Sequence, residues 1–251
     1  STNIISPVLS IITNISFDHT DLLGNTFEKI ANEKAGIIKQ NTSILLGRKQ
    51  KEINMIFEEI ASKKNAPIKY ANPQKYKLDL KGNYQKENCN TAVSAIMELK
   101  IKGWKITNQN ITHGLLNTIQ NTGLLGRWQI LKKKPLIICD TGHNEDGIRQ
   151  IVKQIEETPH ENLHIVFGTV NDKDLCAILK LLPTYACYYF CHANTPRAMN
   201  ATKLKDMAYN HQLSGNSFKS VELALNEAKT KAKPKDLIFI GGSTFIVAEV
   251  I

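Results

Sequence analysis

The sequence lacks the features of a membrane protein or a disulfide-stabilised secreted protein. No apolar run reaches the length of a transmembrane helix, and the first residues show no basic segment followed by an apolar one, as a secretory signal would. The five cysteines are odd in number and form no Cys-x-x-Cys pair. Several lie in apolar runs, so we interpret them as reduced core residues of a cytoplasmic protein.

Positive charge predominates in the chain but is not concentrated in it. The formal net charge is +9, yet the lysines are scattered and the densest run covers only residues 132–134. No aromatic-rich RNA-binding motif accompanies them. We therefore predict a basic surface that favours small anionic substrates, and neither a nucleic-acid nor a membrane partner.

Apolar, β-branched runs alternate with segments of helical periodicity along the chain, which predicts a doubly wound α/β fold with parallel sheets. A polar Asn-Thr-Gly sequence at residues 121–123 interrupts this alternation, so we place a domain boundary near residue 122. The first part has fewer strands than a closed α/β domain needs. The predicted strands cover residues 8–15, 43–46, 135–139, 163–167, 186–191 and 237–240.

Lys34 stands at an unexpected place in a short predicted helix. Asn25 can cap this helix and Gly36 can end it. Its apolar stripe runs through Ile30 and Ala31, and Lys34 is the next position on that stripe. A lysine on a buried face loses hydration, which favours its neutral amine and hence chemistry. The alternative is that the side chain extends past the helix end into water.

A polar group, Asp18-His19-Thr20-Asp21, directly follows the predicted strand at residues 8–15. Ligands of α/β sheets bind at the carboxyl ends of strands. His19 can therefore ligate a divalent metal there, or it is an ordinary hydrogen-bonded loop residue. With Lys34 nearby in sequence, a joint site is conceivable, because a neutral lysine amine that takes up carbon dioxide becomes a carbamate, an oxygen ligand suited to Mg²⁺.

The second half has its own polar cluster at a strand end, Asp140-Thr141-Gly142-His143-Asn144. Asp140 can accept hydrogen bonds from ribose hydroxyls, and His143 beside a helix N-terminus can approach phosphate. The alternative is a simple turn in which Asn144 caps the helix. Arg127 lies just past the predicted boundary and suits bidentate phosphate binding, or it makes a surface salt bridge near Trp128.

Taken together, six segments resemble the folylpolyglutamate synthase / dihydrofolate synthase family of the ATP-dependent Mur ligase superfamily. Their order and spacing along nearly the whole chain are more specific than any one of them. They are residues 13–24, the Glu33-Lys34-Ala35-Gly36-Ile37-Ile38 run, residues 82–88, Gly126-Arg127-Trp128, Asp140-Thr141-Gly142-His143-Asn144 and residues 171–174.

The resemblance implies an incomplete P-loop-type ATPase domain at residues 1–122 and a Rossmann-like Mur ligase C-terminal domain at residues 123–251. By position, His19 and a carbamylated Lys34 match the family's Mg²⁺ ligands, and Asn88 matches an ATP contact. The same matching assigns nucleotide and phosphate contacts to Arg127, Asp140 and His143. Lys34, Arg127 and His143 would then belong to the catalytic machinery.

The implied reaction joins L-glutamate to a folate or dihydropteroate carboxylate. ATP first phosphorylates the carboxylate, and the glutamate amine then attacks the acyl phosphate to form an amide. Such catalysis rests on positioning and on charge neutralisation. The implied cofactors are ATP and Mg²⁺, and the implied parent enzyme is a cytoplasmic monomer.

The chain departs from the family pattern in several places. It contains no G-x-x-x-x-G-K-[ST] phosphate loop, and the family's upstream metal-binding Glu has no counterpart. We therefore interpret the chain as a C-terminal fragment of a longer enzyme. We expect that this fragment does not turn over ATP by itself. Tyr84 stands where the family commonly has His, and Glu145 stands where Pro commonly follows His-Asn.

Two other functional classes remain open on sequence grounds. One is a Mur-type ligase that adds amino acids to a UDP-sugar in cell-wall synthesis. The other is a non-catalytic nucleotide-binding module. The sequence does not distinguish a dihydrofolate synthase from a folylpolyglutamate synthase.

Overall fold

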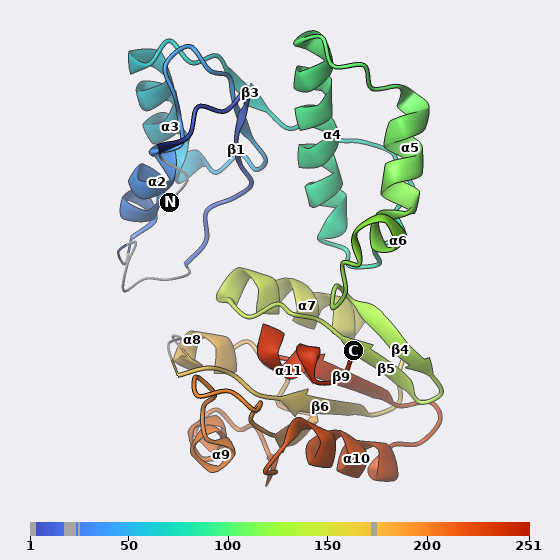
Figure 1. The fold of residues 1–251 in the computed structure, drawn as a ribbon. Coiled ribbons are helices and arrows are strands. Elements are labelled where there is room, and N and C mark those ends of the chain that lie inside the picture. The colour runs from blue at the N-terminus through green and yellow to red at the C-terminus, as the bar shows by residue number, and fades with distance from the viewer. Residues whose placement is uncertain (1–3, 18–23, 25, 172–174) are drawn as a thin grey trace. The chain divides into compact units, whose positions relative to one another are not determined.

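The computed structural model describes residues 4–17, 24, 26–171 and 175–251, and Figure 1 labels the helices and strands within them. Contacts divide the chain into two compact units. The first unit contains Ser1–Asp79 and Tyr84–Thr122, and the second contains Leu80–Asn83 and Gly123–Ile251. Each unit builds its own sheet.

The first unit contains a parallel sheet of three short strands in the order β1-β2-β3. The strands are β1 (Ser10–Ile12), β2 (Ile44–Leu46) and β3 (Ile68–Tyr70). The strand expected over residues 8–15 is thus only three residues long. Residues 13–16 leave the sheet, and a side chain rather than a strand binds the backbone of Ile15.

Helices pack on this small sheet and next to it. They are α2 (Phe27–Ala35), α3 (Lys51–Lys63), α4 (Gln85–Ile101), α5 (Asn108–Leu116) and α6 (Thr118–Thr122). Ile30 of α2 and Phe57 of α3 share one core with Ile44 of β2. A smaller core joins α4 to α5 through Val93 and Ile111. Helix α4 also contacts β2, and Glu87 in its first turn binds Arg48, two residues after that strand.

The second unit is built on a six-stranded sheet in the order β4-β5-β9-β6-β7-β8. The strands are β4 (Gln129–Lys133), β5 (Leu136–Cys139), β6 (Leu163–Phe167), β7 (Cys187–Phe190), β8 (Gly215–Ser217) and β9 (Leu237–Gly241). Five of them run parallel, but β4 pairs antiparallel with β5. The expectation of a purely parallel sheet is therefore wrong at this edge, because the chain enters β5 from an adjacent hairpin partner rather than through a crossover helix.

Helices cover both faces of the six-stranded sheet (Figure 1). On one face lie α7 (Glu145–Glu157), α8 (Leu175–Leu179) and α9 (Ala201–Tyr209), and on the other lie α10 (Val221–Lys231) and α11 (Thr244–Ala248). Successive strand residues alternate between the two cores, as Ile165 and Val166 do. This layered arrangement confirms the predicted doubly wound α/β class.

The short segment Leu80–Asn83 is tied to α7 within the second unit. The Gln154 side chain accepts a hydrogen bond from the Asn83 N–H at 2.7 Å and donates one to the Lys81 carbonyl at 3.1 Å. The Asn83 amide also donates to Glu157 at 2.7 Å. Gln154 is 7% exposed, so its polar groups are buried and satisfied.

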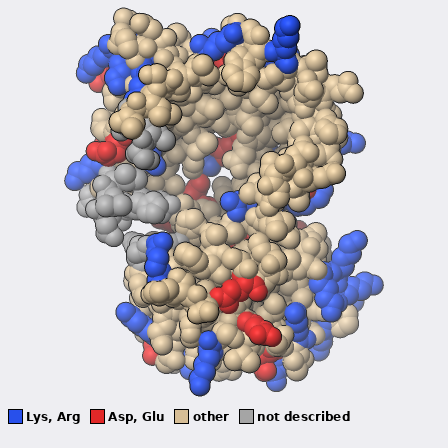
Figure 2. Space-filling view, viewed as in Figure 1, with Lys and Arg blue, Asp and Glu red and all other residues tan. Residues whose placement is uncertain are grey.

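The face in Figure 2 shows Lys and Arg side chains in several separate places, with acidic side chains between them. Three cysteines are buried, but Cys176 and Cys187 are exposed, contrary to the expectation that all five belong to the core. Within the described part of the chain, no helix has both the length and the apolar composition to cross a bilayer.

Candidate functional site

The polar cluster at residues 140–144 lies at the carboxyl end of β5, which runs between the edge strand β4 and β9 in the chain's larger sheet. Asp140 is only 2% exposed, and its two carboxylate oxygens accept different backbone N–H groups. Oδ2 accepts from Trp128 at 2.7 Å, and Oδ1 accepts from Gly142 at 2.8 Å. Asp140 therefore joins two loops, a role that the sequence did not indicate.

The loop Gly126-Arg127-Trp128 owes its shape to that carboxylate. Gly126 and Trp128 both have positive φ, at 70° and 46°, and Trp128 is an unusual residue in this conformation. Its N–H bond to Asp140 and the burial of its ring hold it there. The Arg127 guanidinium hydrogen-bonds to the Thr141 hydroxyl, and the Thr141 N–H donates to the Gly126 carbonyl at 3.0 Å. The structure thus brings Arg127 to the Asp140 strand end.

His143 lies two residues further along the same loop. Its Nδ1 is 3.0 Å from the Thr141 carbonyl, and because a carbonyl oxygen only accepts, Nδ1 carries the proton of this hydrogen bond. That bond orients the ring. Arg127, Asp140 and His143 consequently form one group around Thr141, which we call the β5 cluster.

The helix that follows the β5 cluster begins with an ordinary cap. Asn144 is the N-cap of α7, and its side chain accepts a hydrogen bond from the Gly147 N–H at 2.9 Å. Glu145 and Asp146 occupy the first turn, where their charges stabilise the helix end but oppose an added anion. Glu145 pairs with Arg149 at 2.7 Å, which offsets part of its charge. The capped-turn interpretation therefore holds for Asn144.

For Lys34 the structure confirms the alternative of an exposed side chain near the helix end and contradicts the buried position. The buried residues of α2 are Ile30, Ala31 and Ala35, whereas Lys34 is exposed. The turn after Ala31 thus directs Ala35, not Lys34, into the core, so burial supplies no neutral amine here. The cap is also different: Thr26 is the N-cap and accepts from the Lys29 N–H at 3.2 Å.

The predicted metal site can be followed only in part. His19 and its neighbours Asp18 to Asp21 lie outside the described residues, as does Asn25. In the described ranges, no group of three or more His, Cys, Asp and Glu residues could hold a metal ion. The unmodified Lys34 side chain has no oxygen atom, whereas Mg²⁺ prefers oxygen ligands. Only the carbamate form would supply an oxygen donor.

Asn88 belongs to the first unit, on the first turns of α4. Its side chain is exposed, and its amide donates to the Oε1 of buried Gln85 at 2.9 Å. Asn88 and Lys34 thus lie in one unit, and the β5 cluster lies in the other.

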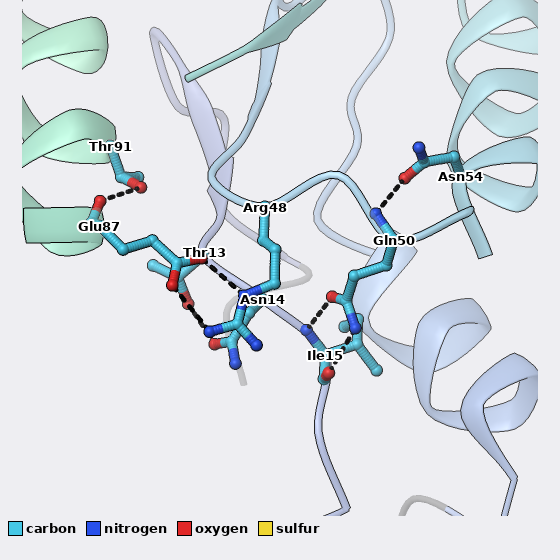
Figure 3. A network of polar contacts seen from close by, with 8 residues as sticks. All are labelled: Thr13, Asn14, Ile15, Arg48, Gln50, Asn54, Glu87 and Thr91. Carbon is cyan, nitrogen blue, oxygen red and sulfur yellow. Dashed lines mark hydrogen bonds and ion pairs between the residues drawn. The ribbon is translucent and has the colours of Figure 1, made fainter. Parts of the chain in front are cut away.

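Sequence reasoning missed a second polar cluster, at the carboxyl edge of the three-stranded sheet (Figure 3). Gln50 is the N-cap of α3, yet its side chain does not cap that helix. Instead it accepts from the Ile15 N–H and donates to the Ile15 carbonyl, both at 2.8 Å, as a neighbouring strand would. Gln50 therefore fixes the segment that follows β1. A Gln at an N-cap, where Ser, Thr, Asp or Asn is usual, was the available signal.

Comparisons with known proteins match both parts of the chain to one family. The family model "Mur ligase middle domain" matches residues 1–115, and the model "Mur ligase, glutamate ligase domain" matches residues 126–244. This chain belongs to the Mur ligase family. The two Mur ligase models meet at the same region of the chain where the two compact units join.

Among Mur ligases, the chain is similar to enzymes of folate metabolism. It is 25% identical to a dihydrofolate synthase/folylpolyglutamate synthase of Bacillus subtilis, covering 100% of this chain and 63% of that protein. It is 30% identical to the enzyme of the same description from Buchnera aphidicola subsp. Schizaphis graminum, covering 99% of this chain and 62% of that protein. The chain thus spans less than two thirds of the length of these relatives.

Solved structures of similar proteins share the fold. E. coli FolC in complex with DHPP and ADP matches with a TM-score of 0.83 and 26% identity, over 99% of this chain and 61% of that one. A bifunctional folylpolyglutamate synthase/dihydrofolate synthase with Mn, AMPPNP and L-glutamate bound matches with a TM-score of 0.82 and 25% identity, over 99% and 62%.

Proposed function

We propose that the protein is an ATP-dependent ligase that joins L-glutamate to the carboxylate of a folate or of dihydropteroate. The observation that carries this proposal is the similarity, over almost the whole chain, to E. coli FolC with DHPP and ADP bound and to a related enzyme with AMPPNP and L-glutamate bound. The relatives that it resembles in sequence bear the names of the same two activities. We take the enzyme to be a cytoplasmic monomer without a nucleic-acid or membrane partner.

The β5 cluster supplies groups that suit a nucleotide. Nucleotides of open α/β sheets bind at the carboxyl ends of the strands, and Asp140 directly follows β5. Arg127 offers a guanidinium held by the Thr141 hydroxyl, and His143 lies beside the start of α7. We assign Arg127 and His143 to the neutralisation of phosphate charge and Asp140 to the ribose and to the support of the loop.

The first unit would hold the other parts of the machinery. Asn88 offers an exposed amide at the start of α4, which fits a contact to ATP. We assign His19 and a carbamylated Lys34 to Mg²⁺, which would neutralise charge on the transferring phosphoryl group. Because Lys34 is exposed in this structure, carbon dioxide can reach its amine. Intact-mass measurement with and without bicarbonate checks this point, and an increment of one carbon dioxide that Lys34→Arg abolishes supports it.

In the proposed reaction, the residues of this chain position the reactants and neutralise charge. The folate or pteroate carboxylate displaces ADP from the γ-phosphorus, and the glutamate amine then displaces phosphate from the acyl carbon. Arg127 and His143 are expected to stabilise negative charge during phosphoryl transfer, and neither residue needs to form a covalent bond.

The test is an assay of ADP release by the protein as its gene encodes it. Release is expected only when L-glutamate and either dihydropteroate or tetrahydrofolate are both present, and Asp140→Ala is expected to abolish it. A UDP-muramyl acceptor serves as the competing substrate. Release that requires this acceptor would replace the proposal with a cell-wall ligase, and nucleotide binding without any release would leave a binding module.

Residues 1–251 alone should not turn over ATP, because no G-x-x-x-x-G-K-[ST] sequence is present in them to cradle the β- and γ-phosphates. The check is the same assay on this polypeptide. ADP release that depends on glutamate and is lost in Asp140→Ala would contradict this expectation.

A further inference from the structure

We propose that Arg48 and Glu87 form a positioning pair that holds Asn88 in place for nucleotide binding. The inference rests on the proposed function, since it concerns the ATP contact assigned to Asn88. Neither member of the pair is among the residues that the sequence singled out.

The pair joins the end of a strand to the start of a helix (Figure 3). Arg48 follows β2 by two residues, and Glu87 lies in the first turn of α4. Arg48 Nε donates to Glu87 Oε1 at 2.6 Å, and Arg48 Nη2 donates to Oε2 at 2.7 Å. Two parallel charge-assisted bonds fix both the distance and the orientation of the two side chains.

The start of α4 has no other side-chain device at its N-cap. Tyr84 is the N-cap residue, has helical backbone angles and makes no capping bond with its side chain. Glu87 is the third helical residue, which in a capping box would reach back to the N-cap. Here it points sideways to Arg48 instead. The ion pair therefore sets where the helix begins relative to the sheet.

Close packing beneath the pair leaves little room for adjustment. A Cβ added at Gly47 would clash with the Thr13 carbonyl and would lie 2.6 Å from the Thr91 hydroxyl of α4. The Thr91 hydroxyl in turn donates to the Glu87 carbonyl at 3.2 Å. The ends of β1 and β2 and the first turns of α4 thus meet at Gly47, and the ion pair spans this junction.

Asn88 follows Glu87 directly, so its backbone moves with the pair. Its amide is held by Gln85 one turn earlier, so the Asn88 side chain follows the position of that first turn. A shift of the turn would displace the Asn88 amide from any ligand. Positioning errors of about 1 Å are enough to lower the efficiency of a site markedly.

The Arg48 and Glu87 side chains are 29% and 35% exposed, so solvent screens part of their attraction, but the bidentate contact can still stabilise the fold. Measuring Tm beside the binding constants therefore separates a loss of positioning from unfolding.

The experiment measures steady-state ligation and, separately, ADP binding in the protein as encoded. Arg48→Ala, Arg48→Lys and Glu87→Gln should each raise KM for ATP and Kd for ADP about fivefold, with kcat within about twofold of the unmodified protein. Arg48→Lys is included because an ammonium cannot make the bidentate contact. The charge reversal Arg48→Glu with Glu87→Arg should recover part of the loss.

Glu227→Gln is the matched control, because Glu227 pairs with Lys231 at 3.8 Å on the surface of α10 in the second unit. It should leave KM, Kd and Tm unchanged. Single Arg48 and Glu87 variants with unchanged Kd for ADP would overturn the proposal, as would a loss of kcat that parallels a fall in Tm. If the unmodified protein binds ADP but does not ligate, the proposed function fails, while the effect on Kd still decides the role of the pair.

Discussion

Asp140 shows at the scale of a single residue how structure and proposed function meet. Its carboxylate closes two loops by accepting the Trp128 and Gly142 N–H groups, at 2.7 and 2.8 Å. The same strand-end position is the one that a nucleotide would need. Under the proposed function, a variant of this residue is therefore expected to alter both the stability of the site and the binding of a nucleotide.

Asp140→Ala should lower the free energy of unfolding by about 1–3 kcal/mol for each buried N–H that is left without a partner. Asp140→Asn retains one acceptor oxygen and should lose less. Urea unfolding of both variants measures the difference. Equal losses in Ala and Asn would contradict the role of the two hydrogen bonds.

Gln50 offers a second test on a single side chain. Gln50→Leu removes both partners of Ile15, a residue that is 2% exposed, and should destabilise the first unit by about 1–3 kcal/mol. Gln50→Glu keeps the acceptor for the Ile15 N–H but not the donor to its carbonyl. The urea midpoint of Gln50→Glu should therefore lie between those of the unmodified protein and Gln50→Leu. A Gln50→Glu variant as unstable as Gln50→Leu would argue against the two hydrogen bonds between Gln50 and Ile15.

The environment of Asp236 leads to a prediction of how the free energy of unfolding depends on pH in the acid range. Burial alone would raise its pKa, but hydrogen bonds from the Lys233 N–H, the Asn162 side chain, His164 and the Asn162 N–H together lower it below the usual 3.8. A lowered pKa means that its contribution is present above 3.8 and is lost as the pH falls through the lower value of the folded state. Asp236→Asn should flatten the acid limb of urea midpoints measured from pH 6 to pH 2. An unchanged acid limb would contradict this.

Lys34 shows where prediction from single residues fails. The sequence placed Lys34 on the apolar stripe, but Ala35 takes the buried place at the end of this nine-residue helix and Lys34 is exposed. In a helix this short, a difference of one residue decides which side chain faces the core. The sequence placed Asp140 and His143 in one strand-end loop, in contrast, and only the family resemblance joined Arg127 to them; the structure brings all three together around Thr141. Arg48 and Gln50 act through contacts that are distant in sequence, and no local pattern announced them.

At the scale of elements, hydrophobic periodicity predicted the well-buried strands. It missed the strands whose extended conformation depends on pairing with a neighbouring strand. The predicted strand at residues 163–167 agrees with β6, which is buried along its whole length. The antiparallel strand β4 was missed because lysines and an exposed Ile130 give it no apolar run. Strand β8 has the sequence Gly-Asn-Ser, which carries no strand propensity, and only its pairing with β7 makes it extended.

Gly215 makes the dependence of β8 on its partner testable. A Cβ at this position would clash with the Tyr188 carbonyl of β7, so Gly215→Ala should force the strands apart and lower the free energy of unfolding by about 1–3 kcal/mol. Gly114→Ala in α5 is the control, because nothing lies within 4 Å of its added Cβ. That control should be neutral or stabilising by roughly 0.5–1 kcal/mol. A Gly215 variant as stable as the control would mean that β8 does not pack as described.

At the scale of the whole molecule, the two units divide the proposed machinery between them. Asn88, Lys34 and the Arg48–Glu87 pair belong to the first unit, and the β5 cluster belongs to the second. The two Mur ligase family models follow the same division. The proposed function therefore predicts that residues of both units are needed for turnover, whereas variants such as Gln50→Leu and Gly215→Ala should destabilise the unit that contains them.

The central claim is the ligation itself, and the direct measurement is transfer of isotope-labelled L-glutamate. The protein as encoded, supplied with ATP and Mg²⁺, should convert dihydropteroate or tetrahydrofolate into a labelled amide, with one ADP released for each glutamate joined. Arg127→Ala should lose this transfer by about 10²–10³-fold, as expected when a group that neutralises transition-state charge is removed. Transfer that persists in Arg127→Ala, or ADP release without a labelled pterin amide, would contradict the account.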